Sequence, residues 1–366
     1  MRVIAIVNDR ARRGGTENAR TLRSLLPRAE VIATRDLEDL QRVAHDCAKA
    51  APDLVVVAGG DGSAAALLNA LRKAATQAGL GAGTLGRLAL LKLGTGNGWA
   101  NSMGAPPLAF SLEKLRQAID RRETLPFRRF DLVEVEGLIA QFAGTGWDAE
   151  LIDDFHAQKT ARSFLPRRTR QGLAGYLNGL MTRAVPRNLM QPRVEIEVQN
   201  LGSPAMGVSA RGEAYELPET RPGGPKSQLY SGPVSVCAVG TTREWGFLFT
   251  SMPFAGLVPR RFNFRMYVGP TLSALIRIPA LWAGRHPMSN MVNWLCDDVE
   301  VRFSRPVPLQ AGGDLIGHRD RIRYTIAQEQ VDVLDWARLI VPELEASPLS
   351  TFVPTALAGL SRLKLV

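Results

Sequence analysis

The feature that most restricts the fold is an apolar run that ends in a glycine-rich turn and continues directly into a helical pattern. The run Leu54–Ala58 leads into GGDGS at residues 59–63, which an alanine- and leucine-rich segment follows. A second turn, GTGNG at residues 94–98, ends the apolar run Leu88–Leu93. Unpaired N–H groups at a helix start attract phosphate, and glycine lets a ligand touch the backbone. Both turns therefore predict phosphate binding.

The spacing of the two turns places them side by side. From Gly59 to Gly94 the chain advances by 35 residues, about one strand–helix–strand unit. In a right-handed crossover, such turns leave neighbouring parallel strands at the same carboxyl edge of the sheet. That edge is where ligands bind in open α/β sheets.

Asp61 is the unexpected member of the first turn, because a carboxylate repels phosphate groups. Its presence is explained if it holds a magnesium ion or accepts a proton from an attacking hydroxyl. The alternative is a tight turn in which Asp61 caps the following helix.

Residues 1–125 predict an open, mostly parallel α/β domain, because continuous apolar runs alternate with helical patterns. The expected strands are Arg2–Val7, Glu30–Ala33, Leu54–Ala58 and Leu88–Leu93. The expected helices are Asn18–Leu26, Asp36–Ala50, Ser63–Ala78 and Leu108–Arg122.

Residues 126–340 predict an antiparallel β domain, because apolar and polar residues alternate along several short runs. The expected strands are Phe130–Glu136, Leu138–Ala143, Arg193–Gln199, Pro233–Val239, Val299–Ser304 and Ile322–Ile326. One helical insertion is expected near Ala149–Arg183, and a loop over Glu216–Gly232. The C-terminal segment 341–366 is expected to pack back on the N-terminal domain.

Composition excludes several classes of protein. The 366 residues suffice for two domains, and 45% apolar with 22% charged residues is typical of a globular protein. No apolar stretch is long enough for a membrane span, and the five apolar residues near the N-terminus are too few for a secretory signal. Three dispersed cysteines predict reduced core residues, and four scattered histidines have no zinc spacing. We therefore expect a cytoplasmic protein.

The net charge of +10 is ambiguous. It suits an acidic partner such as an anionic lipid, a nucleotide or a nucleic acid. A solvated basic surface explains it as well.

Other glycine motifs do not fit. Gly60 to Ala65 matches the dinucleotide fingerprint G-x-G-x-x-A, but that motif needs an acidic residue about twenty positions later. No Asp or Glu occurs from Lys73 to Gly94. The sequence also lacks a P-loop and the H-R-D and D-F-G set of protein kinases.

The two turns together resemble the diacylglycerol kinase-type lipid kinase family, including its bacterial lipid kinases. Its catalytic domain carries G-G-D-G-[TS] and G-T-G-N-D, which match residues 59–63 and 94–98. The strand ending in Asn8, the segment containing Thr34 and the stretch Phe142–Ile152 are also similar to the family. The resemblance implies an α/β nucleotide domain, a β-sandwich domain and an active site in the cleft between them.

The same resemblance implies ATP and Mg2+ as cofactors and assigns residues to roles. Asp314, in place of the family's Glu, would accept the proton of the lipid hydroxyl. Asp61 would be catalytic and would hold the magnesium ion. The ATP-binding residues would be Asn8, Thr34, Gly59, Gly60, Asp61, Gly62, Ser63, Gly94, Thr95, Gly96 and Asn97.

This sequence departs from the family pattern at three places. Gly98 stands where the family has Asp, residues 8–15 lack the Pro and Ser of the first family turn, and Gly312-Gly313-Asp314 replaces Asp-Gly-Glu. These departures leave room for an altered acceptor or for a protein that binds without turnover.

Two stretches mix arginine with aromatic residues and suit an anionic membrane surface. The first lies in residues 159–172, where the expected docking residues are Arg162, Phe164, Arg167, Arg168 and Arg170. The second is Leu257–Tyr267, for which an amphipathic strand is the alternative. No nucleic-acid-binding motif accompanies either stretch.

The leading hypothesis is an ATP- and Mg2+-dependent lipid kinase, peripheral on the inner face of the membrane. It would phosphorylate a hydroxyl of diacylglycerol, a sphingoid base, ceramide or a glycolipid. Alternatives are a soluble kinase of the NAD kinase or phosphofructokinase type and a non-catalytic lipid- or nucleotide-binding protein. The sequence names neither the acceptor nor the oligomeric state.

Overall fold

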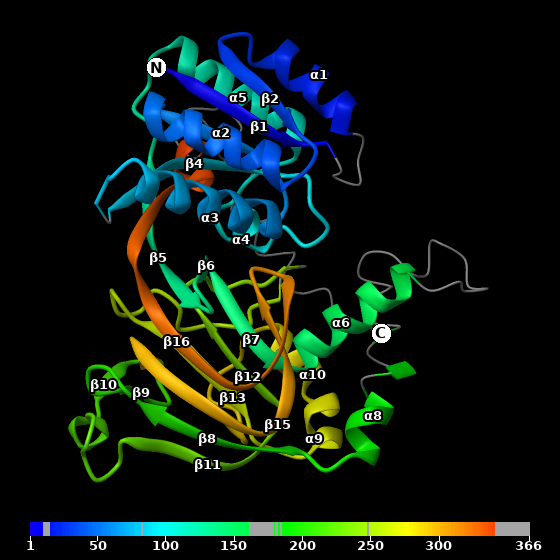
Figure 1. Cartoon of the computed structure of the whole chain (residues 1–366), viewed down its shortest axis with the longest axis vertical. Coiled ribbons are helices and arrows are strands. Elements are labelled where there is room, and N and C mark those ends of the chain that lie inside the picture. The colour runs from blue at the N-terminus through cyan, green and yellow to red at the C-terminus, as the bar shows by residue number, and fades with distance from the viewer. Residues whose placement is uncertain are drawn as a thin grey trace, which may run out of the picture.

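The computed structural model describes residues 1–9, 15–81, 83–160, 185–246 and 249–340, together with Gly179, Thr182 and Arg183. These residues form an N-terminal α/β half and a β half, one above the other in Figure 1. The fold class is α/β, as the sequence predicts.

Four strands of the N-terminal half lie parallel to one another in the order β4-β3-β1-β2. They are β1 (Val3–Asn8), β2 (Ala29–Thr34), β3 (Leu54–Gly59) and β4 (Thr84–Lys92). β1 and β3 are buried along almost their whole length, which explains why their sequences are apolar without alternation.

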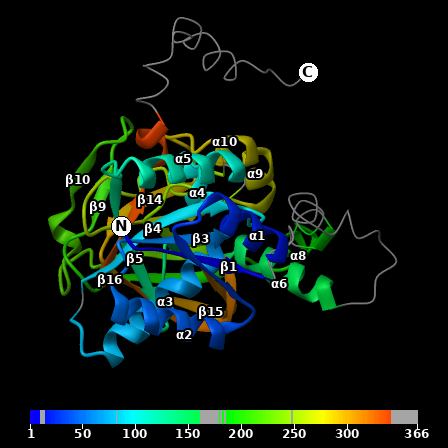
Figure 2. The same ribbon diagram turned by 90° about the horizontal axis from the view of Figure 1, so that it is seen from above.

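Helices cover both faces of this sheet (Figure 2). They are α1 (Gly15–Leu25), α2 (Leu37–Ala50), α3 (Asp61–Gln77), α4 (Gly98–Ser102) and α5 (Leu108–Asp120). α2 contacts α3 on one face, and α1 contacts α5 on the other. Asp36 caps α2 by accepting a hydrogen bond from the N–H of Asp39. The predicted strands and helices of this half are present, with small shifts at their ends.

The second half consists mainly of antiparallel strands around a separate apolar core that includes Phe262, Phe264 and Tyr324. Its strands and those that join the halves are β5 (Phe127–Val135), β6 (Leu138–Ala140), β7 (Phe142–Gly146), β8 (Val194–Asn200), β9 (Met206–Val208), β10 (Ala214–Glu216), β11 (Gln228–Val234), β12 (Val236–Gly240), β13 (Phe262–Tyr267), β14 (Met291–Cys296), β15 (Asp298–Ala311) and β16 (Asp314–Leu334). Its helices are α6 (Trp147–Thr160), α8 (Val185–Met190), the 3-10 turn η3 (Pro218–Thr220), α9 (Thr271–Ile276) and α10 (Ile278–Trp282).

β16 joins the two halves (Figure 1). Its first part pairs antiparallel with β15, and its last part pairs in parallel with β4. Residues from Ala327 to Trp336, which the sequence grouped with the second domain, pack in the N-terminal core. Trp336 is fully buried and donates from Nε1 to the carbonyl oxygen of Leu90 at 3.0 Å. The domain boundaries stay a prediction, and segment 341–366 lies outside the described residues.

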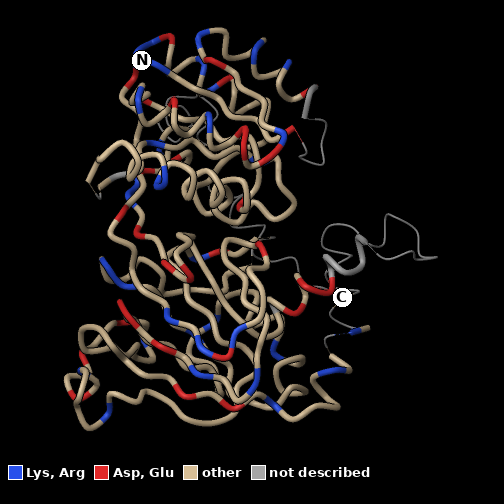
Figure 3. Tube along the Cα trace, in the orientation of Figure 1, with Lys and Arg blue, Asp and Glu red and all other residues tan. Residues whose placement is uncertain are grey.

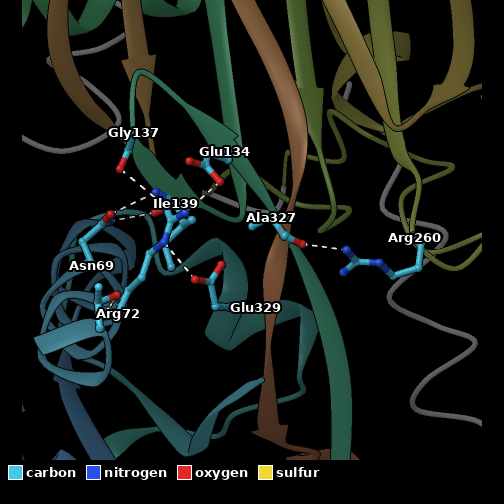
Figure 4. Close-up of polar contacts among 9 residues, drawn as sticks. Asn69, Arg72, Glu134, Gly137, Ile139, Arg260, Ala327 and Glu329 are labelled. Carbon is cyan, nitrogen blue, oxygen red and sulfur yellow. Dashed lines mark hydrogen bonds and ion pairs between the residues drawn. The ribbon is translucent and has the colours of Figure 1, made fainter. Parts of the chain in front are cut away.

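A set of polar contacts fastens α3 to the β half (Figure 4). Arg72 forms ion pairs with Glu134 at 2.9 Å and Glu329 at 3.0 Å. Asn69 exchanges hydrogen bonds with the backbone N–H and carbonyl of Ile139. These contacts hold α3, the helix that follows the first glycine turn, against the β5–β6 hairpin.

The β half differs from the prediction in several places. The predicted strand Pro233–Val239 spans the end of β11 and most of β12, and the predicted loop Glu216–Gly232 contains the start of β11. Among the described strands β11 pairs with β8 alone, and such an edge strand tolerates Gly232 and Pro233. The expected helical insertion begins as α6, but much of it falls outside the described residues, and α9 and α10 were not expected.

Candidate active site

The two glycine turns meet at the carboxyl edge of β3 and β4, as their spacing predicts. β3 and β4 are parallel neighbours with Gly59 opposite Lys92. A methyl group on Gly94 would lie 2.3 Å from the Cα of Gly60, and one on Gly60 would lie 2.9 Å from the Cα of Gly94. Only glycine allows the backbones to approach this closely.

Asp61 connects the two turns. Its Oδ2 accepts from the N–H of Gly98, and its Oδ1 accepts from the N–H of Trp99, both at 2.9 Å. Asp61 therefore caps α4, the helix that follows the second turn. It is also the first residue of α3. Burial raises its pKa, while the hydrogen bonds from Trp99 and Gly98 oppose that rise.

Side chains fix the conformation of each turn. Asn97 has a φ of 51°, and its amide exchanges hydrogen bonds with the N–H and carbonyl of Gly94 at 2.7 and 2.8 Å. Asn8 donates to the hydroxyl of Ser63 at 3.1 Å, which links the end of β1 to the first turn of α3. The first N–H groups of the 17-residue α3 point to the same edge and are suited to phosphate.

Asp314 reaches the first glycine turn from the far end of the sequence. A methyl group on Gly62 would lie 3.0 Å from Oδ2 of Asp314. The turn between β15 and β16 makes this possible, because Gly312 and Gly313 have φ values of 58° and 92°. The N–H of Gly313 donates to the side chain of Gln310, which holds the turn.

A cavity of about 1120 Å3 opens at these turns and continues into the β half. Its polar end is lined by nine predicted nucleotide-binding residues and by the predicted base. These residues are Asn8, Thr34, Gly60, Asp61, Gly62, Ser63, Gly94, Thr95, Gly96 and Asp314. Gly59 and Asn97 support the turns without lining the cavity.

The other end of the cavity is largely apolar. Its lining includes Trp147, Ile152, Met252, Leu281 and Trp282. Sequence reasoning did not find these residues, because they come from separate segments that only the fold brings together. The cavity can therefore hold an amphiphilic molecule with its polar end at the glycine turns.

Gly98 lies against the backbone of the β half. A Cβ atom there would be 2.5 Å from the nitrogen of Gly246 and 2.9 Å from the carbonyl oxygen of Glu244. Gly96 is also close, because its Cβ would be 3.3 Å from the Cα of Gly246. Segment 244–246 occupies the space that a side chain at position 98 would need, which gives a steric reason for glycine.

The residues present suit a magnesium ion only if phosphate groups of a bound ligand were to supply most of its oxygen ligands. Within the described ranges, no group of three or more His, Cys, Asp or Glu side chains could hold a metal by itself. Magnesium commonly uses one or two carboxylates together with phosphate oxygens and water. Asp61 and Asp314 both line the polar end of the cavity and supply such carboxylates.

The two predicted docking stretches have different outcomes. Arg162, Phe164, Arg167, Arg168 and Arg170 lie outside the described residues. In the second stretch, the docking interpretation is wrong, because Phe262 and Phe264 on β13 are fully buried in the core. The strand that was the alternative is present as β13, although all six of its residues are buried and neither face is solvated.

The distribution of charge does not single out a partner. Lys and Arg lie over both halves and are interspersed with Asp and Glu along the described trace (Figure 3). Among the helices that the structure describes, none is both long enough and apolar enough to cross a membrane.

Comparison with known proteins agrees with the fold and with the glycine turns. Residues 2–133 match the family model of the diacylglycerol kinase catalytic domain, which confirms the resemblance read from the sequence. The matched region carries both glycine turns and all of the N-terminal strands. The N-terminal half is therefore similar to a family of kinase catalytic domains.

Solved structures extend the likeness to most of the chain. The crystal structure of a putative diacylglycerol kinase from Bacillus anthracis str. Sterne has a TM-score of 0.58 at 14% identity, covering 90% of this chain and 96% of that chain. Another diacylglycerol kinase structure from the same organism has a TM-score of 0.53 at 13% identity, with the same coverage. At these identities the likeness shows the two-part fold alone. No curated protein matched the chain.

Proposed function

We propose that the protein is an ATP- and Mg2+-dependent lipid kinase that transfers the γ-phosphate of ATP to a lipid hydroxyl. Diacylglycerol, a sphingoid base, ceramide and a glycolipid are the acceptors to test. The enzyme would work at the inner face of the membrane, with residues 159–172 as its docking segment. The match of residues 2–133 to a kinase catalytic domain supports the kinase class.

One observation carries the proposal: a carboxylate faces a phosphate-type glycine turn at the mouth of an apolar cavity. Asp314 lies against Gly62, while Trp147 and Trp282 line the same cavity further in. Phosphoryl transfer depends mostly on positioning and on charge neutralisation. A lipid whose chain occupies the apolar end would present its hydroxyl between Asp314 and the first glycine turn.

The chain's own groups divide the work as follows. The N–H groups at the start of α3 and the glycine backbones hold the phosphates. Asp314 accepts the proton of the acceptor hydroxyl as the new bond to phosphorus forms. Asp61 keeps the two turns aligned through the N–H groups of Gly98 and Trp99. The bound magnesium ion neutralises phosphate charge.

The experiment is transfer of label from γ-labelled ATP, with Mg2+, to mixed micelles that each contain one candidate lipid. Asp314→Asn keeps the shape of the side chain and removes the base, so transfer should fall by about 100-fold or more while ATP binding is retained. Asp320→Asn, at an exposed aspartate further along β16, is the matched control and should retain activity.

Two results would contradict the proposal. Label that enters only a soluble acceptor supports a kinase of the NAD kinase or phosphofructokinase type. ATP binding without transfer to any acceptor supports a non-catalytic binding protein, the alternative that Gly98 raised.

A further inference from the structure

Arg265 is a cation placed in the apolar end of the cavity. It lies in the middle of β13, where Phe262 and Phe264 belong to the core of the β half. Because side chains alternate along a strand, Arg265 is directed to the opposite face from these two rings. That face borders the cavity, and Arg265 is among the residues that line it.

The guanidinium of Arg265 is buried, and few hydrogen bonds offset the cost of removing its charge from water. Only 5% of Arg265 is exposed, and Nη1 donates to the carbonyl oxygen of Ser251 at 2.6 Å. Its Nε is buried and has no hydrogen-bond acceptor among the described residues. Burial lowers the pKa of Arg265 to about 10, so the group is still a cation at neutral pH.

Arg72 provides a comparison, because it is an arginine whose charge is paired with carboxylates. Arg72 is more exposed and nevertheless forms ion pairs with two carboxylates, Glu134 and Glu329. Within the part of the chain that the structure describes, no carboxylate forms an ion pair with Arg265. A buried charge is normally paired, because leaving it unpaired is strongly unfavourable. The arrangement therefore calls for an anion that is not part of the chain.

The unpaired atom indicates how that anion would bind. Nε and Nη2 form one edge of the guanidinium, and this edge binds a carboxylate or phosphate through two parallel hydrogen bonds. Nη1 already donates to the carbonyl oxygen of Ser251, and this hydrogen bond fixes the plane of the guanidinium. A neutral hydroxyl or ester would use the edge less well, because a charged acceptor makes the stronger hydrogen bond.

We propose that Arg265 is the receptor for an anionic group, a carboxylate or a phosphate, on the molecule that occupies the apolar end of the cavity. This inference rests on the proposed function only in identifying that molecule as the acceptor. The preferred acceptor is then an acidic lipid with a hydroxyl group. Arg265 selects it over a neutral lipid, and Asp314 acts on its hydroxyl.

Binding can be tested without any catalysis. Decanoate and decan-1-ol have the same chain length, and their binding can be followed by the change in total tryptophan fluorescence, because Trp147, Trp245 and Trp282 line the cavity. At pH 8 we expect decanoate to bind at least about tenfold more tightly than decan-1-ol. Decanoate is used because alkyl phosphates could also bind at the glycine turns.

Arg265→Met keeps the length of the side chain and removes the charge. It should reduce decanoate binding to the level of decan-1-ol and leave decan-1-ol unchanged. Arg302→Met, on the exposed side of β15, is the control and should change neither affinity. Arg265→Lys, which keeps the charge but loses the two-bond edge, should give intermediate binding and provides a second variant if Met prevents folding.

Equal binding of the two probes to the wild type would overturn the proposal, as would a decanoate preference that survives in Arg265→Met.

Transfer assays then separate this inference from the proposed function. The acceptors tested are phosphatidylglycerol, which carries a phosphate, and 12-hydroxyoctadecanoate, which carries a carboxylate; these are the two anionic arms of the assay. Diacylglycerol is the neutral arm. Loss of labelling in Arg265→Met for only one anionic arm supports the proposal and identifies the anion. Decanoate preference without any lipid labelling supports the anion site while contradicting the lipid kinase.

Discussion

Replacing Gly98 with alanine tests the contact between the second glycine turn and the β half. The added Cβ would lie 2.5 Å from the nitrogen of Gly246 and 2.9 Å from the oxygen of Glu244. Carbon contacts are favourable near about 3.5 Å, so segment 244–246 would have to move by about 1 Å. Both contacts are with backbone, which cannot turn aside as a flexible side chain does.

Overpacking of this kind costs about 1–3 kcal/mol. Alanine also restricts the unfolded chain, which offsets about 0.4–1 kcal/mol of that cost. We therefore expect Gly98→Ala to lower the free energy of unfolding by about 0–2.6 kcal/mol, with a mid-range value of about 1.3 kcal/mol. Gly98→Asp, which introduces the family's residue, should be more damaging because its side chain is larger and charged.

Urea denaturation of the purified protein measures this difference directly. Gly81→Ala is the matched control, because a Cβ at Gly81 would have no atom within 4 Å among the described residues. Equal stability of Gly98→Ala and Gly81→Ala would refute the steric explanation. Full stability of Gly98→Asp would refute it more strongly, and would mean that the two halves are further apart in solution.

Two further predictions concern residues that hold the halves and the turns together. Arg72→Ala should lower the free energy of unfolding by about 1–3 kcal/mol, because Glu329 is left largely buried without its cation. Lys73→Ala, at an exposed lysine, is the control. An equal loss of stability in both variants would contradict the role of the ion pairs. Burial raises the pKa of Asp61, so the folded protein keeps that proton to higher pH than the unfolded chain does. Its contribution to stability is therefore lost as the pH rises from 3.8, the ordinary value, through the raised pKa. The stability advantage of wild type over Asp61→Asn, measured by urea denaturation, should shrink over this range, and a constant difference would contradict the burial argument.

The N-terminal half was predictable because its signals are local. Uninterrupted apolar runs mark β1 and β3, and glycines mark the turns that follow β3 and β4. The spacing between those turns predicted that they lie side by side, since a right-handed crossover brings both to the same edge of the sheet. Asp61 shows the limit of this reasoning, because its two N–H partners belong to the other turn.

The β half was less predictable because its strands depend on distant partners. β15 and β16 are much longer than the runs Val299–Ser304 and Ile322–Ile326 suggested, since exposed polar positions within them still pair through the backbone. The stretch that contains β13 was ambiguous because its arginines are mixed with aromatic residues, which suited membrane docking as well as a strand. Arg265 lines the cavity that the fold places beside this strand. No local pattern indicates a cavity built from separate segments.

The path of β16 has a consequence for how the protein is synthesised. During translation, β1 to β4 leave the ribosome long before residues 327–336 exist, yet β4 needs β16 as a neighbour and Leu90 needs Trp336 as a partner. Until then the nascent α/β half presents an unpaired strand edge, which is a site for wrong pairing. A fragment that stops at residue 133 would keep that edge permanently. The sheet of the N-terminal half is thus completed only once the chain has been made as far as Trp336.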